Sequence, residues 1–163
     1  MRAPRLLAAG TAAASLLLSG CGLEEPSPIV SVVSGGEFVH GEATSYCFEG
    51  QDPSVEAGSE KGCTVDAAKR PELIRVQAGE QVGVDVEKAL SDRAWVVVLR
   101  PQGPTDPAKQ PAEQASPIQD EHYFGFTPQF DGGAPLELQV KSLASDRPGA
   151  AVTGLWRFVL APE

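Results

Sequence analysis

The chain has 163 residues and three cysteines, and its 22 acidic against 13 basic residues give a formal net charge of −9 at pH 7. This length suits one domain, and a hydrophobic share of 42% supplies enough apolar surface for a core. A surface this acidic repels phosphate backbones and anionic headgroups, so we expect no nucleic-acid partner.

The first 21 residues have the organisation of a bacterial lipoprotein leader. Arg2 and Arg5 precede an apolar run over residues 6–18, which is shorter than the roughly 20 residues of a membrane-spanning helix. The tetrapeptide "LSGC" resembles the lipobox, in which the cysteine thiol is acylated and becomes the first residue after cleavage. We therefore predict cleavage of residues 1–20 and lipidation, including palmitate, at Cys21. The alternative is an ordinary signal peptide followed by a free cysteine.

A lipidated Cys21 predicts that the protein is held at the extracytoplasmic face of the cell membrane, because two acyl chains on one sulfur give stable anchoring. Residues 22–28, "GLEEPSP", contain two prolines and two acids, which is typical of a short tether. The leader holds two arginines and no acid, so the remaining 143 residues carry a formal charge of −11. We expect residues 29–163 to form a single β domain.

Cys47 and Cys63 form an even pair once Cys21 is assigned to lipidation. They flank a polar loop with Gly, Pro and Ser, and an exported chain meets an oxidising environment. This predicts a disulfide. The alternative, a metal or redox site, finds little support because the chain has no C-x-x-C motif and its two histidines are far apart in sequence.

Most of the remaining sequence has a hydrophobic period of two, which indicates β-strands. In the first half the pattern covers "IVSVV", "EFVH" and "ATSYCF". The segment "ELIRVQAGEQVGVDV" has two alternating runs joined by a Gly-containing turn, which predicts either a hairpin or a corner between two sheets. Between these groups, "VDAAKR" favours one helical turn that Pro71 limits.

The second half continues the strand pattern around one interruption. "AWVVVLR" predicts a strand buried on both faces, and residues 101–117 predict a loop because they hold five prolines. Residues 118–130 are rich in aromatic side chains, whereas "PLELQVKSL" and "VTGLWRFVL" alternate again. Short strands with frequent turns and almost no helical periodicity predict an all-β protein, an antiparallel β-sandwich that is immunoglobulin-like in outline. A small β-barrel is the alternative.

The aromatic segment offers the candidate binding surface, formed by His122, Tyr123, Phe124 and Phe126. In an extended strand Tyr123 and the two phenylalanines face opposite sides, so they do not all enter one core. A bend at Gly125 or Pro128 would instead bury the whole cluster.

The sequence contains no G-x-S-x-G elbow, H-E-x-x-H helix or P-loop, so we predict no catalytic residues, no metal site and no cofactor. Two alternatives to a noncatalytic binding or structural domain stay open. One is a metal-binding or metal-handling envelope lipoprotein that uses His40 or His122 with carboxylates. The other is a secreted hydrolase with a serine or aspartate nucleophile beside His122.

Several of these segments together resemble a family of small actinobacterial lipoproteins that is known as a domain of unknown function. The resemblance rests on the lipobox Cys21, "FVHGEATSYCF", Cys63, "VQAGEQVGVDV", "AWVVV" and the final "GLWRFVL". It covers most of the chain after the leader. It implies an envelope-anchored β domain and assigns no active-site residue. Separately, we expect an envelope protein or a small ligand as partner.

Overall fold

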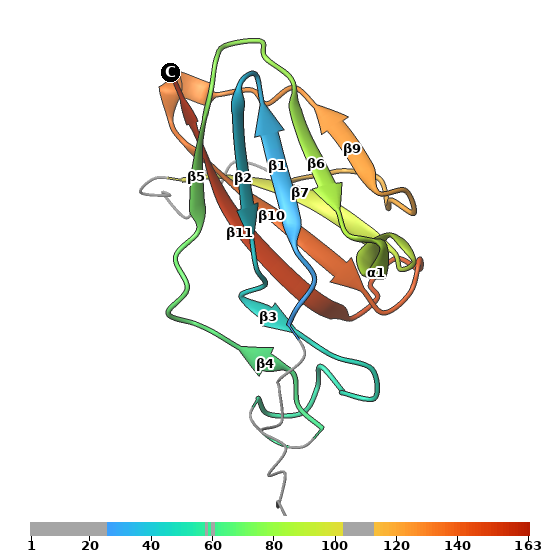
Figure 1. Cartoon of the computed structure of the whole chain (residues 1–163). Coiled ribbons are helices and arrows are strands. Elements are labelled where there is room, and N and C mark those ends of the chain that lie inside the picture. The colour runs from blue at the N-terminus through green and yellow to red at the C-terminus, as the bar shows by residue number, and fades with distance from the viewer. Residues whose placement is uncertain (1–25, 58, 60, 103–112) are drawn as a thin grey trace, which may run out of the picture.

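The computed structural model describes residues 26–57, 59, 61–102 and 113–163. The predicted leader, Cys21 and most of the predicted proline-rich loop lie outside these residues. The elements in chain order are β1 (Val30–Ser34), β2 (Glu37–Gly41), β3 (Ser45–Tyr46), β4 (Thr64–Val65), β5 (Glu72–Val76), β6 (Val82–Val86), α1 (Lys88–Ser91), β7 (Trp95–Pro101), β8 (Gln114–Ala115), β9 (Tyr123–Phe126), the 3-10 helix η2 (Asp131–Gly133), β10 (Leu136–Leu143) and β11 (Val152–Pro162) (Figure 1).

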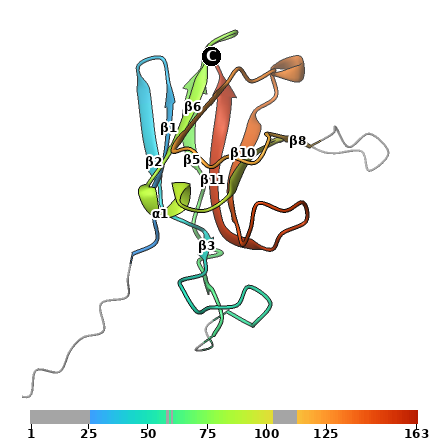
Figure 2. The same cartoon turned by 90° about the vertical axis from the view of Figure 1, so that its right-hand side faces the viewer.

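The strands form two sheets that pack face to face (Figures 1 and 2). Sheet A has the order β2-β1-β6-β9, and sheet B has the order β4-β3-β11-β10-β7-β8, with β5 also paired to β11. The predicted all-β sandwich is confirmed. The alternative of a small β-barrel is wrong, because the two sheets do not join into one closed sheet.

The core between the sheets follows from the period of two in the sequence. On each strand alternate apolar side chains point inward, as in β10, where Leu136, Leu138 and Val140 are buried. The neighbouring strand β11 contributes Trp156 and Phe158 at positions opposite Val140 and Leu138. The other inward side chains are Val30, Val32, Ile74, Val76, Val82, Val84, Val86, Trp95, Val97, Leu99 and Leu160.

The segment over β5 and β6 is a corner between the sheets and not a hairpin. β5 runs parallel to β11 in sheet B, whereas β6 pairs with β1 in sheet A. Gly79, with a φ of +81°, supplies the backbone conformation that the turn between them needs. The Arg75 N–H also donates to Glu37 Oε2 of β2 at 2.8 Å, so β5 contacts both sheets. β5 therefore covers one side of the sandwich, whereas on the other side no strand among the described residues joins β8 to β9.

Three local expectations differ from the structure. The predicted helical turn at residues 65–70 is instead a turn, in which Asp66 Oδ1 accepts the Ala68 N–H. The short helix α1 is not signalled by any helical periodicity, because it has only four residues. The predicted loop over residues 101–117 contains β8, which pairs with Val98 and Leu99 of β7. The prolines of this loop lie on either side of Gln114 and Ala115, so the N–H groups of these two residues are available for pairing.

The first described residues are fixed to the domain. The Trp156 indole N–H donates to the Pro28 carbonyl at 2.9 Å in a buried position, and the Ala43 N–H donates to Ser27 Oγ at 3.3 Å. The Trp156 ring packs on Tyr46 of β3, and Ser27 and Ala43 line a pocket together with residues of β3 and β4. These two strands form one end of the sandwich (Figure 1). We call this end the base.

The predicted disulfide between Cys47 and Cys63 is present, and it closes the loop that hangs from the base. Replacing both cysteines by alanine is expected to lower the free energy of unfolding by about 3 kcal/mol, the chain-entropy value for a loop of this size. Urea unfolding of the domain without its leader, compared with the parent protein, measures the difference. A loss below about 0.5 kcal/mol would show that the loop is already ordered in the unfolded chain or is uncoupled from the fold.

Candidate functional site

The outer face of sheet B carries paired charges beside apolar side chains, among them Leu73 of β5, which is 49% exposed. Arg157 Nε donates to Glu137 Oε1 at 2.6 Å, and Arg100 and Lys141 both contact Glu113, at 2.8 and 3.4 Å. Burial raises the pKa of Glu113 and Glu137, but the hydrogen bonds and positive charges of these partners outweigh it and hold each carboxyl pKa below its usual value. The charged side chains of this face therefore form a network of paired groups.

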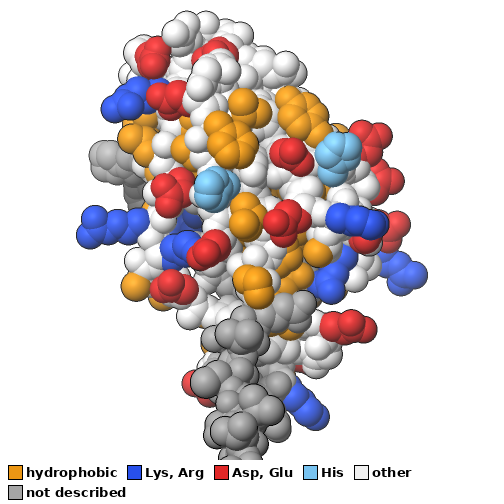
Figure 3. Space-filling model, viewed as in Figure 1, with side chains coloured by type: hydrophobic (Ala, Val, Ile, Leu, Met, Phe, Trp, Pro, Cys, Tyr) orange, Lys and Arg blue, Asp and Glu red, His pale blue; other side chains and the backbone are white. Residues whose placement is uncertain are grey.

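The outer face of sheet A is different, because hydrophobic side chains gather on it (Figure 3). The pairing of β2, β1, β6 and β9 places Phe38, Val33, Gly83 and Gly125 in one row, and His40, Ser31, Asp85 and Tyr123 in the next. Phe38 is 62% exposed and Tyr123 is 45% exposed. We call this surface, defined by Phe38, Val33, Gly83 and Tyr123, the aromatic face.

Gly83 determines how Tyr123 lies on the aromatic face. A Cβ atom at Gly83 would lie 2.7 Å from Tyr123 Cε2, so the ring occupies the space that any other residue would fill. The tyrosine ring therefore covers β6 and leans away from the outer edge of β9. An aromatic ring that packs over a glycine of the neighbouring strand is a cross-strand contact that helps to fix the register of a sheet.

The predicted site residues divide between two places. Tyr123 lies exposed on the aromatic face, whereas Phe124 and Phe126 point to the other side of β9 and pack against the core. Their rings stack with centroids 6.0 Å apart. His122 is exposed just before β9, and its carbonyl accepts the Val86 N–H. The alternation expected for an extended strand is therefore present, and the predicted bend at Gly125 is absent.

Phe38 was missed as a site residue by the sequence reasoning. It alternates with Val39, and both are apolar, so the pattern of "EFVH" does not reveal which of them faces the core. The pairing of β2 with β1 decides this by placing Phe38 opposite Val33 on the outer face. His40, also exposed, lies beside it, with ring centroids 6.0 Å apart.

A second feature of the site is a pocket of about 170 Å³ on the side of the sandwich that carries β8 and β9. Phe124 and Phe126 of β9 form one wall, Val97 and Leu99 of β7 lie on the inner side, and Ala115 of β8 is across from them. The chain passes here from sheet B to sheet A. The Trp95 indole N–H fixes this crossing by donating to the Glu121 carbonyl at 2.8 Å.

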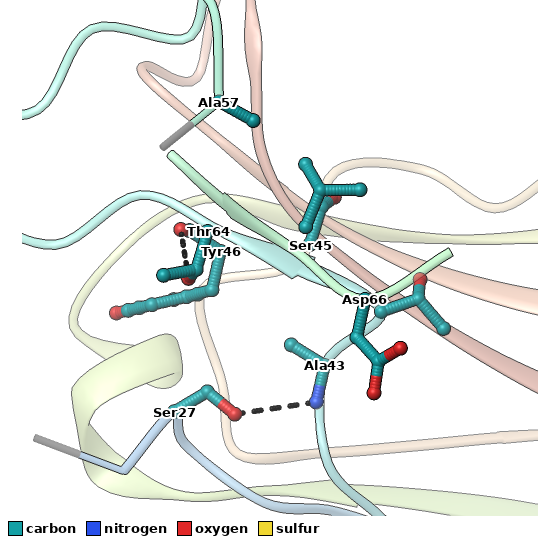
Figure 4. Close-up of a pocket in the computed structure, with 9 residues that line it drawn as sticks. Ser27, Ala43, Ser45, Tyr46, Ala57, Thr64 and Asp66 are labelled. Carbon is teal, nitrogen blue, oxygen red and sulfur yellow. Dashed lines mark hydrogen bonds between the residues drawn. The ribbon is translucent and has the colours of Figure 1, made fainter. Parts of the chain in front are cut away.

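A larger pocket, of about 450 Å³, lies at the base and is lined by small and hydroxyl-bearing side chains (Figure 4). Its hydroxyl groups serve the fold: Thr64 Oγ1 donates to the Tyr46 carbonyl, and Thr44 Oγ1 donates to the Leu155 carbonyl. Asp66 is the carboxylate among its lining residues, and neither histidine lines it. We assign this pocket no chemical role.

Two findings on the described side chains concern the metal-binding and serine-hydrolase alternatives. Within residues 26–57, 61–102 and 113–163, no three His, Cys, Asp or Glu side chains cluster closely enough to hold a metal ion. In the same ranges neither imidazole forms a hydrogen bond with a serine hydroxyl. His40 belongs to the edge strand β2, and His122 lies at the opposite edge beside β9.

No family model matches this chain, no curated protein matches it, and no solved structure matches it. Within the described part of the chain, none of the helices has the length and apolar character needed to cross a membrane.

Proposed function

We propose that this protein is a lipid-anchored, noncatalytic binding module of the cell envelope, which docks another envelope protein through the aromatic face. The observation that carries the proposal is the pair of exposed aromatic side chains on the outer face of sheet A. Phe38 and Tyr123 are 62% and 45% exposed there, whereas the exposed apolar side chains on the strands of sheet B, Val65, Leu73 and Val152, are aliphatic. Aromatic side chains are enriched at protein–protein interfaces, because they bury a large area at low entropic cost.

The lipobox supports the attachment, and the tether sets the orientation. Six residue steps separate Cys21 from Ser27, the first side chain bonded to the domain. At roughly 3.3–3.6 Å per residue, this chain reaches about 20 Å at most. Anchoring would therefore hold the base near the bilayer. The aromatic face runs along the side of the sandwich, away from the base, and would stay open to a partner in the envelope (Figure 1).

The experiment places a photo-crosslinking amino acid at Phe38 or at Tyr123 in intact cells. We expect each position to give a discrete protein adduct, because a docked partner lies within reach of both side chains. Val152 is the matched control, since it is 42% exposed but begins β11 in sheet B. Adducts at all three positions in equal yield, or at none of them, would contradict the proposal.

A further inference from the structure

We propose that the outer edge of β9 binds an extended, basic segment of a partner protein, which pairs as a fifth strand of sheet A. The inference rests on the proposed role as a binding module, but the main-chain pairing uses the edge of the sheet, and of the aromatic face only Tyr123 borders it. Three observations carry it: the backbone groups of β9, the pocket beside them and the charge around them.

The backbone groups along the outer edge of β9 are arranged for strand pairing. β9 is the last strand of sheet A, and the Val86 N–H donates to the His122 carbonyl. Hydrogen bonding alternates along an antiparallel strand, so Phe124 and Phe126 bond to β6 while Tyr123 and Gly125 direct their N–H and C=O groups outward. Among the described residues no backbone group pairs with these outward groups. Such an edge is a template for an added strand.

The pocket between β9 and β8 lies where an added strand would place alternate side chains. A residue paired to β9 and pointing inward meets Phe124 and Phe126, with Val97 and Leu99 beneath. The pocket of about 170 Å³ is open to solvent and is lined by Gln114, Ser116 and Thr127 as well as by the apolar side chains, and its size suits one aromatic or large aliphatic side chain. On the outer side Tyr123 leans toward Gly83 and leaves the edge uncovered.

The charge beside β9 indicates a basic occupant. Residues 118–131, which contain β9, hold no lysine or arginine, and Asp120 and Glu121 come just before the strand. Asp85 is exposed directly opposite Tyr123 on the ladder. A lysine or arginine on the outer side of the added strand would contact Asp85 and the tyrosine ring. A second copy of this chain would bring like charges together, which disfavours pairing of β9 with itself.

The test uses a seven-residue peptide in which lysine alternates with valine around a central phenylalanine, and an acidic twin with glutamate for lysine. Hydrogen exchange of the full-length protein in detergent micelles is measured at the Tyr123 and Gly125 amides. We expect the basic peptide to slow exchange at both amides at least tenfold and the acidic twin to leave exchange unchanged. Equal effects of the two peptides, or no effect of either, would overturn the proposal.

Two controls separate strand pairing from other modes of binding. Two further peptides carry N-methyl groups on every second amide, one on the odd-numbered and the other on the even-numbered residues. Only one of the two sets of amides faces β9, so one methylated peptide should lose the protection and the other should keep it. The substitution Gly125→Pro removes an outward donor and keeps the ladder to β6, so it should abolish protection at Tyr123.

Phe38→Ser should leave the protection by the basic peptide intact, which keeps this test separate from docking on the aromatic face. Protection that rises with protein concentration in the absence of peptide would identify a second copy as the occupant and overturn the proposal.

Discussion

Replacing Cys21 by alanine is expected to abolish palmitate incorporation and to leave either uncleaved precursor or protein released from the membrane. The reason is that the thiol of Cys21 is the proposed site of acylation, and the domain has no other proposed attachment to the bilayer. Metabolic labelling with radioactive palmitate, followed by separation of membrane and soluble fractions, measures both effects. Undiminished labelling of the Cys21→Ala protein would refute the lipid anchor.

The matched control is the double substitution Cys47→Ala with Cys63→Ala. These two thiols are joined in the disulfide and are buried, so they are not acylated. The double variant should therefore incorporate palmitate at the level of the parent protein and remain in the membrane fraction. Loss of label in the control as well would show that labelling depends on folding and not on Cys21 alone.

Replacing Trp156 by alanine is expected to lower the free energy of unfolding by about 3–5 kcal/mol. The side chain is 0% exposed at the centre of β11, and it packs on Tyr46 with ring centroids 5.8 Å apart. Its truncation leaves a cavity that rigid neighbouring strands do not fill. Urea unfolding of the domain measures the change, and Phe38→Ala, at an exposed position, should cost less than about 0.5 kcal/mol.

Trp156→Phe separates the hydrogen bond from the packing. Phenylalanine keeps most of the ring but leaves the buried Pro28 carbonyl without its donor, which costs about 1–3 kcal/mol. The free energy of unfolding of Trp156→Phe should therefore lie between that of the parent protein and that of Trp156→Ala. Equal stability of Trp156→Phe and the parent would mean that another donor reaches the Pro28 carbonyl.

The strands could be predicted from the sequence because their side chains alternate locally. Leu136, Leu138 and Val140 repeat every second residue, so the strand and its inner face follow from the pattern alone. The parallel pairing of β5 with β11 could not be predicted in this way, since it joins residues more than eighty positions apart. The same limit applies to β8, whose two residues carry no periodic signal.

The candidate site was predicted in part, for a related reason. Tyr123 and the neighbouring phenylalanines were singled out by composition, and alternation separated them correctly onto two sides. Phe38 and Gly83 could not be assigned to the site from the sequence. The aromatic face is formed by residues from four separate strands, and only the pairing of β2, β1, β6 and β9 brings them together. The pocket beside β9 likewise needs β7 and β8 from the other sheet.

The position of β1 determines how the domain would bear mechanical force. The chain leaves the base directly into β1, which is hydrogen-bonded to β2 on one side and to β6 on the other. A partner that pulls on the far end while the N-terminus is held would load both ladders in shear, so many hydrogen bonds must break together. The indole bond to Pro28 would resist first. Strands loaded in shear withstand a larger force than strands that are peeled apart, because in peeling the hydrogen bonds break one after another.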